Sequence, residues 1–171
     1  MIIEGKAISY LQDNINTDEI IPARYLNTSD PDQLASHCME DLDKEFLTRK
    51  KAIGADILVT GSNMGCGSSR EHAPIAIKHA GIKAIIAPSF ARIFFRNAIN
   101  TGLPIFECKD PEFFKAVKNG DVLRIHADQG TVENTTTGKK HAIQHMPAFL
   151  QELIKVGGLV PFAKAIVKKS K

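Results

Sequence analysis

The sequence predicts an α/β fold built on a mainly parallel sheet with added antiparallel strands. Between residues 55 and 108, short apolar runs alternate with amphipathic stretches of about ten residues, the pattern of βαβ units and a parallel sheet. Between residues 121 and 144, short runs are separated by turn sequences at 128–130 and 137–138. Such spacing favours an antiparallel hairpin or the edge of a small barrel.

Composition and charge indicate an ordinary globular chain forming one domain, residues 1–171. Hydrophobic residues make up 43% and charged residues 24%, as in typical domains of roughly 100–200 residues. The net charge of +3 is mild and interspersed, which argues against nucleic acid as a partner. No apolar run approaches the ~20 residues that span a bilayer, and the N-terminus lacks a signal peptide. We therefore expect a cytoplasmic protein with no membrane contact.

The first fifty residues predict one strand and one helix. Residues 2–11 alternate loosely between apolar and polar side chains and favour a strand. Asp30 followed by Pro31 is typical of a helix start, with Asp30 as the cap and Pro31 in the first turn. That helix is expected to end near Met39. The highly charged residues 40–51 are expected to be exposed.

Glycines and prolines divide the rest of the chain into further elements. Gly81 and Gly102 follow periodic apolar stretches, and glycine is typical just beyond the end of a helix. The expected strands are residues 55–60, 82–87 and 103–108, and the expected helices are residues 71–79, 89–100, 110–120 and 147–157. The lysine-rich residues 164–171 are typical of the last turns of a helix, where the helix dipole favours positive charge.

The three cysteines, Cys38, Cys66 and Cys108, are odd in number and widely spaced. No CxxC pair is present, so the spacing encodes neither a zinc ribbon nor a self-sufficient iron–sulfur site. A disulfide framework is not expected in a reducing compartment. We therefore expect free thiols and no metal bound by this chain.

A glycine-rich stretch, Gly65-Cys66-Gly67-Ser68-Ser69-Arg70-Glu71-His72, lies between a predicted strand and a predicted helix. In open α/β sheets, ligands bind beyond the carboxyl ends of the strands, where this stretch falls. Glycines let the backbone approach a ligand, and amides at a helix N-terminus favour anions. Ser68 and Ser69 add hydroxyls, and Arg70 adds a donor fork suited to a carboxylate. The stretch is therefore predicted to bind a small carboxylate or phosphate.

A structural role for the same residues is the competing interpretation. Ser68 and Glu71 have the spacing of a capping box, so Ser68 could cap the helix. Pro74 would then lie in the second turn and leave the carbonyl of Arg70 unpaired. A helix that begins near His72 or Ala73 accommodates Pro74 and frees Ser68. The stretch has neither the P-loop lysine nor a GxGxxG or GxSxG pattern, but phosphate binding and a stand-alone anion-binding module remain alternatives.

Read together, several segments resemble the swivelling domain of the aconitase superfamily. The glycine-rich stretch matches its signature. Four further segments, spread over nearly the whole chain, match the family pattern in the same order: residues 14–26, 89–97, 100–104 and 157–159. The resemblance implies a three-layer β/β/α domain of the aconitase C-terminal type. A free-standing copy of this domain resembles the small subunits of two-chain hydro-lyases, 3-isopropylmalate dehydratase and homoaconitase.

The resemblance also implies roles for individual residues in the reversible dehydration of a hydroxy dicarboxylate. Ser68 would act as the catalytic base, while Ser69 and Arg70 would hold substrate carboxylates. Arg24 is a second candidate carboxylate ligand. A [4Fe-4S] cluster is expected on a separate large subunit, in a heterodimer or heterotetramer, so this chain alone should be inactive.

Asn27 and Thr28 lie where the family discriminates between substrate side chains. A bulky apolar pair there would suit an isopropyl group, and an arginine at position 27 would suit an extra carboxylate. The chain has neither, but the missing arginine favours isopropylmalate, and hence leucine biosynthesis, over homoaconitate or a methylated malate. Arg92 and Arg96 are expected to pair with carboxylates of this chain, with a role toward substrate or partner as the alternative. The helical spacing of Phe90, Phe94 and Phe95 favours core or interface positions.

Overall fold

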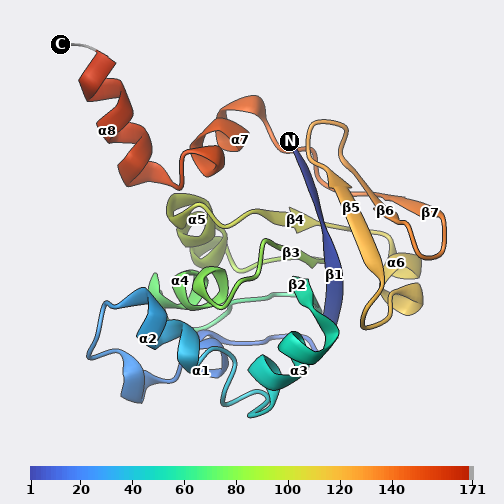
Figure 1. Cartoon of the computed structure of the whole chain (residues 1–171), viewed down its shortest axis with the longest axis horizontal. Coiled ribbons are helices and arrows are strands. Elements are labelled where there is room, and N and C mark those ends of the chain that lie inside the picture. Colours follow the sequence, from blue (N-terminus) through green and yellow to red (C-terminus); the bar gives the residue numbers. More distant parts are fainter. Residues whose placement is uncertain (170–171) are drawn as a thin grey trace.

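One seven-stranded sheet runs through the protein, in the strand order β4-β3-β2-β1-β5-β6-β7. The computed structural model describes residues 1–169, so Lys171 of the lysine-rich end lies outside the described residues. Figure 1 shows β1 near the middle of the sheet, with the helices gathered mostly to one side. The strands are β1 Ile2–Tyr10, β2 Ala55–Thr60, β3 Ala84–Ala87, β4 Ile105–Glu107, β5 Val122–His126, β6 Thr131–Asn134 and β7 Lys139–Ala142.

Strand β1 joins a parallel half of the sheet to an antiparallel half. Its second half pairs in parallel with β2, and β2 and β3 continue the parallel order to β4. Its first half pairs with β5 in antiparallel orientation, followed by β6 and β7. The predicted α/β fold with added antiparallel strands is therefore confirmed, but the sheet is not mainly parallel as predicted, because three strand pairs are parallel and three are antiparallel.

The two halves bury their strands differently. Ile57, Leu58 and Val59 of β2 are all fully buried, as expected where helices or other layers cover both faces of a parallel sheet. In β5 the buried residues Leu123 and Ile125 alternate with more exposed neighbours, as in an antiparallel sheet with one face toward solvent. This difference explains why apolar runs predict the first half and turn sequences predict the second.

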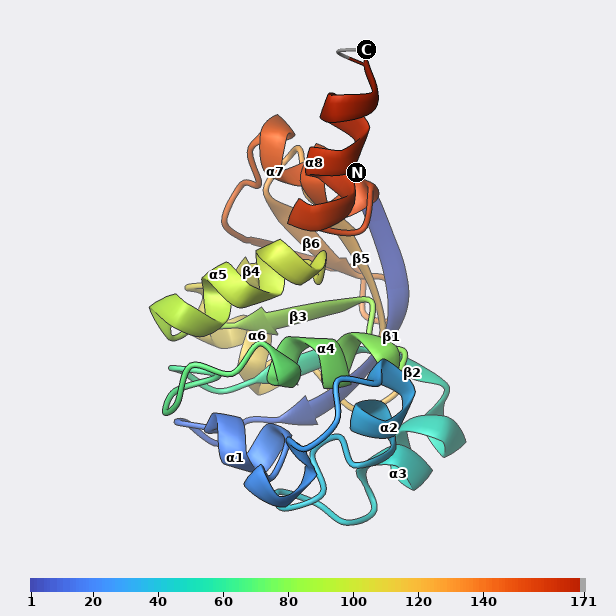
Figure 2. The same ribbon diagram turned by 90° about the vertical axis from the view of Figure 1, so that its left-hand side faces the viewer.

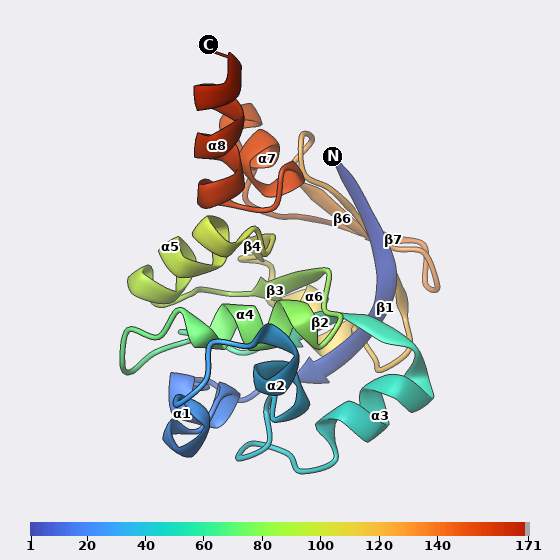
Figure 3. The same cartoon turned by 60° about the vertical axis from the view of Figure 1, so that its left-hand side comes forward.

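Helices α2, α4, α5 and α7 form a row in which each packs against the next, and Figures 2 and 3 show this row along one side of the sheet. The short α1 packs against α4, and α3 packs against β1 and β2. The helices are α1 Thr17–Ile20, α2 Pro31–Ser36, α3 Phe46–Ile53, α4 His72–His79, α5 Arg92–Thr101, α6 Pro111–Ala116, α7 Ala148–Lys155 and α8 Leu159–Lys169, with a 3-10 turn at Ala23–Tyr25.

Three of the helix predictions need correction. Residues 40–51 are not simply exposed, because buried Phe46 anchors α3 and tertiary burial outweighs a charged, weakly amphipathic sequence. Helix α6 ends at Ala116, since Val117 is extended and buried. Helix α2 ends at Ser36 rather than near Met39, because Met39 adopts a left-handed φ of +62° that a helix cannot continue. The predicted stop at residues 157–158 is confirmed, and a further helix, α8, follows it and stands out from the body in Figure 1.

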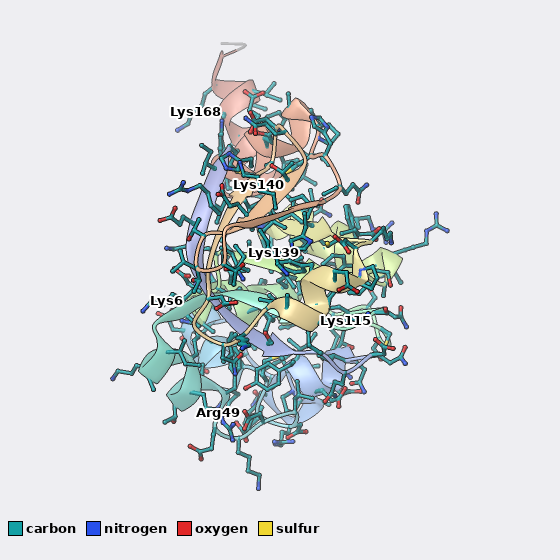
Figure 4. The ribbon with its side chains drawn as sticks, turned by 90° about the vertical axis from the view of Figure 1, so that its right-hand side faces the viewer. Lys6, Arg49, Lys115, Lys139, Lys140 and Lys168 are labelled. Carbon is teal, nitrogen blue, oxygen red and sulfur yellow. The ribbon has the colours of Figure 1, made fainter. Side chains whose placement is uncertain are left out.

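Charged side chains are spread over the surface rather than gathered. Figure 4 shows Lys6, Lys115 and Lys168 on separate elements along one side of the molecule, together with Lys139, Lys140 and Arg49. Within the described residues, no helix is long and apolar enough to cross a bilayer.

Candidate functional site

Residues 61–71, here called the serine–arginine loop, lie between two other segments of the aconitase-like pattern. On one side, Gly65 N donates to the carbonyl of Ile15 at 2.8 Å, and Thr17 N donates to the carbonyl of Cys66 at 2.9 Å. On the other, Met64 forms an isolated parallel bridge with Phe90. Segments far apart in sequence are thus joined to the loop by backbone hydrogen bonds.

Two glycines of the pattern are required by close approach. Gly65 has a φ of +80°, and a Cβ there would lie 2.1 Å from the ring of Phe94. A side chain at this position would be strained and would also collide with the buried ring. At the other end of α5, a Cβ on Gly158 would lie 2.3 Å from the carbonyl oxygen of Asn100. The segments at 100–104 and 157–159 therefore contact each other.

Ser68 does not cap the helix that follows it. Helix α4 begins at His72, with Glu71 at the cap position and no side-chain cap hydrogen bond, so the predicted start near His72 is confirmed. Pro74 then lies in the first turn, where an N–H would have no helical partner. The carbonyl of Ser68 accepts from Thr17 Oγ1 at 3.0 Å. Its hydroxyl is exposed and has no hydrogen-bond partner among the described residues, as is the case for Ser69.

Arg70 is held by α1. Its Nη1 donates to Asp18 Oδ1 and, at 3.5 Å, to the carbonyl of Ile21. Asp18 lies in the first turn of α1, which Asn16 and Glu19 fix through a reciprocal capping box. The sequence reasoning did not identify Asp18 as a site residue, although the Asn16-x-x-Glu19 spacing gave the signal for the helix that places it. The side chain of Arg70 is only 17% exposed, so its guanidinium is largely shielded from solvent as well as held by two acceptors.

Arg24 belongs to a separate cluster. Its Nη1 and Nη2 donate to the two carboxylate oxygens of Asp41 at 3.0 and 2.6 Å, and Nη2 also donates to Glu40 at 3.2 Å. Hydrogen bonding to Arg24 lowers the pKa of the Asp41 carboxyl. Of the predicted discriminating residues, Asn27 is exposed, and Thr28 Oγ1 accepts from the amide of Asp30 at 3.1 Å. No described contact joins this cluster to the serine–arginine loop.

Known proteins match this chain over nearly its full length. Residues 2–110 match the aconitase C-terminal domain family. The chain is 55% identical over 169 residues to the 3-isopropylmalate dehydratase small subunit of Caldicellulosiruptor bescii, covering 99% of each chain. The chain belongs to the 3-isopropylmalate dehydratase small-subunit family. The small subunit of Caldanaerobacter subterraneus subsp. tengcongensis is also 55% identical, over 97% of this chain and 100% of that one.

A solved structure supports the same family. The crystal structure described as 3-isopropylmalate dehydratase from Methanocaldococcus jannaschii superposes with a TM-score of 0.86 at 44% identity, covering 100% of both chains. The aconitase-type fold predicted from the sequence motifs is thereby confirmed. The name of the 3-isopropylmalate dehydratase small subunits implies a large-subunit partner.

In this member of the 3-isopropylmalate dehydratase small-subunit family, the aromatic and basic residues between positions 90 and 96 differ in burial. Phe90 and Phe94 are buried and Phe95 is half-buried, which confirms their predicted core positions. Arg92 and Arg96 are exposed and form no ion pair with the residues described here. The prediction that they pair with carboxylates of this chain is wrong, because no carboxylate among the described residues comes within ion-pair distance of either guanidinium.

The thiols of the chain are not arranged to hold a metal cluster. Cys38 and Cys108 are buried, and burial raises the pKa of both thiols. Cys66 Sγ lies 3.4 Å from the carbonyl oxygen of Asn14. Across residues 1–169 no three potential ligands among His, Cys, Asp and Glu come together. The donor set of this 3-isopropylmalate dehydratase small-subunit relative therefore does not fit an iron–sulfur cluster.

Proposed function

We propose that this chain is the small subunit of 3-isopropylmalate dehydratase, a hydro-lyase that interconverts 2- and 3-isopropylmalate in leucine biosynthesis. The observation that carries the proposal is the full-length match to such small subunits at 55% identity. The geometry of the serine–arginine loop supports it, because two exposed serines adjoin an arginine that Asp18 and the carbonyl of Ile21 hold there.

Ser68 is the proposed base. In the dehydration direction, the C–H bond next to a substrate carboxylate breaks, the proton passes to Ser68 Oγ, and the hydroxyl departs from the neighbouring carbon. The proton returns to carbon in rehydration. A serine alkoxide is a poor base to form near neutral pH unless positive charge and N–H donors stabilise it. Arg70 and the amides of the loop are the groups of this chain proposed to do so.

Substrate carboxylates are the proposed ligands of Ser69, Arg70 and Arg24. Nη1 of Arg70 already donates to Asp18 and to the carbonyl of Ile21. Nε and Nη2 are therefore left to donate to a substrate carboxylate. Arg24 has fewer donors to offer, because Asp41 and Glu40 engage three of its N–H groups. We therefore assign the stronger carboxylate contact to Arg70 and a weaker one to Arg24.

The large subunit is the proposed carrier of the [4Fe-4S] cluster. Such a cluster would supply Lewis acidity at the departing hydroxyl and at one carboxylate. Ser68 and Ser69 are exposed in this chain, so a second chain must close over them to exclude water. The exposed apolar side chains of Phe149, Leu159 and Val160 on α7 and α8 support assembly with other chains, in a heterodimer or heterotetramer.

Isopropylmalate is the proposed substrate rather than homoaconitate or a methylated malate. Position 27 is the exposed Asn27, and an arginine would be expected there to pair with the extra carboxylate of homoaconitate. Asn27 offers an amide instead of a cation. Thr28 adds a short side chain whose hydroxyl is already used within its own turn.

The test is reconstitution. The purified chain is mixed with a cluster-bearing large subunit, and hydration of isopropylmaleate is compared with that of the homoaconitate and methylmalate precursors. The proposal predicts that neither chain turns over alone and that the mixture prefers isopropylmaleate. Preference for another substrate would change the specificity assignment, and an inactive mixture would overturn the proposed function.

A further inference from the structure

Five side chains meet beside the residues proposed to discriminate substrates. Arg24 and Tyr25 come from the 3-10 turn that leads into Asn27 and Thr28, and the other three follow helix α2: His37, Glu40 and Asp41. These side chains are joined by hydrogen bonds, ion pairs and a ring stack. They link the start of the discriminating segment, residues 25–28, to a neighbouring turn.

Glu40 is the centre of this network. Its Oε1 accepts from Tyr25 Oη at 2.9 Å and from Arg24 Nη2 at 3.2 Å. Its Oε2 lies 2.6 Å from His37 Nδ1. The pKa of Glu40 is lowered by its hydrogen bonds, the one to His37 contributing most. One carboxylate therefore contacts every member of the network except Asp41.

The aromatic rings of Tyr25 and His37 also contribute to holding this network together. Tyr25 stacks on His37 with centroids 3.6 Å apart and planes 6° from parallel, and the guanidinium of Arg24 lies 4.7 Å from the Tyr25 centroid. Stacking restricts the ring of Tyr25, and the Glu40 carboxylate restricts its hydroxyl. Both the ring and the hydroxyl of Tyr25 are therefore held where the chain leads into Asn27.

Arg24 is oriented by two carboxylates at once. Asp41 contacts the two terminal nitrogens of the guanidinium, and Glu40 takes a second hydrogen of Nη2. A planar guanidinium bound in this way cannot turn without breaking several charge-assisted bonds. The N–H groups left for a substrate are therefore presented in a single orientation.

We propose that Glu40 is a positioning residue for substrate recognition, which holds Arg24 and Tyr25 so that the discriminating segment meets the substrate in one conformation. The inference rests on the proposed function and adds a residue that touches no substrate. Exposed ion pairs contribute little to the stability of a fold. Loss of Glu40 should therefore change substrate affinity and selectivity far more than folding.

The experiment uses the assembled enzyme with three variants of this chain. Glu40→Gln keeps the shape and loses the charge, and Tyr25→Phe removes only the hydroxyl bond. Glu45→Gln is the control, since the Glu45 side chain is exposed and has no hydrogen bond or ion pair in the described chain. We expect Glu40→Gln to raise KM about 10-fold with kcat nearly unchanged, Tyr25→Phe to raise it about 3-fold, and Glu45→Gln to leave it unaltered. Glu40→Gln should also lower the ratio of kcat/KM for isopropylmaleate to kcat/KM for the homoaconitate precursor.

A KM for Glu40→Gln that is unchanged or lower, or a loss in kcat alone, would overturn the proposal. An inactive wild-type mixture would instead sink the proposed function. In that case the NMR amide resonances of Asn27 and Thr28 in the isolated chain test the positioning role of Glu40. They should shift and broaden in Glu40→Gln and not in Glu45→Gln, and resonances that stay unmoved in both would refute the positioning role.

Discussion

The serine–arginine loop is bonded to the neighbouring chain mainly through its backbone, whereas residues 24–28 are held mainly through side chains. Gly65 and Cys66 exchange backbone hydrogen bonds with the segment at 15–17. Arg24 and Tyr25 depend on carboxylates and a stacked ring. The difference suits their proposed tasks, since a base must keep one position while a specificity region can be altered by exchanging side chains.

The largest effect should come from Gly65→Ala, which attacks the backbone-built region. The change combines a positive φ with a Cβ 2.1 Å from Phe94, so it should destabilise the chain by about 2–4 kcal/mol. Gly54→Ala is the control, because Gly54 also has a positive φ but has nothing within 4 Å, and it should cost only about 1 kcal/mol. Urea unfolding measures both. Equal losses at the two sites would mean that the fit against Phe94 is unimportant.

A second, smaller effect separates the two arginines. Arg70→Lys should lower kcat/KM of the assembled enzyme on the order of 100-fold, because lysine cannot keep the Asp18 contact and also offer a fork to substrate. Arg24→Lys should cost about 10-fold. The side chain of Arg70 is 17% exposed and that of Arg24 is 52% exposed, so water weakens the second contact more. The reverse order would contradict the assignment of the stronger carboxylate contact to Arg70.

Acid should produce the smallest effect and should loosen only one of the two regions. The pKa values of Glu40 and Asp41 lie below their ordinary 4.5 and 3.8 because of His37 and Arg24, respectively. A carboxyl with a lowered folded pKa stabilises above its unfolded pKa, and that stability is lost as the pH falls through the folded value. Backbone hydrogen bonds of the serine–arginine loop do not titrate. As the pH falls below about 4, protection of amide hydrogens from exchange should therefore be lost first at residues 25–28. Simultaneous loss of protection at residues 25–28 and in the serine–arginine loop would argue against a segment that is held by side chains.

Local signals account for what the sequence predicted well. The apolar run at 55–60 gave β2, and the conflict between a Ser68 cap and Pro74 gave the true start of α4. Both depend on residues within one turn or strand of each other. The family motifs predicted in addition that segments far apart in the sequence belong to one fold, which periodicity alone cannot predict.

What the sequence did not predict depends on tertiary neighbours. Helix α3 forms in a charged stretch because the side chain of Phe46 is buried in the core. The contacts of Arg70 with Asp18 and of Arg24 with Asp41 join residues 52 and 17 positions apart. The pairing expected for Arg92 failed for the same reason, since a charge pattern does not say which carboxylate lies nearby. The roles of Ser68, Ser69, Arg70, Arg24, Asn27 and Thr28 stay predictions.

The most direct test of the account is hydrogen exchange at the substrate carbon next to the carboxylate. The enzyme assembled with its large subunit is incubated with isopropylmalate in D2O, and deuterium in the recovered substrate is measured by mass spectrometry. Wild type should incorporate deuterium. So should the control Ser62→Ala, because the Ser62 hydroxyl has no hydrogen bond within the described residues. Ser68→Ala should assemble normally but incorporate it about 10²–10⁴-fold more slowly, the usual range for loss of a positioned base. Exchange at the wild-type rate in Ser68→Ala would show that the proton goes elsewhere.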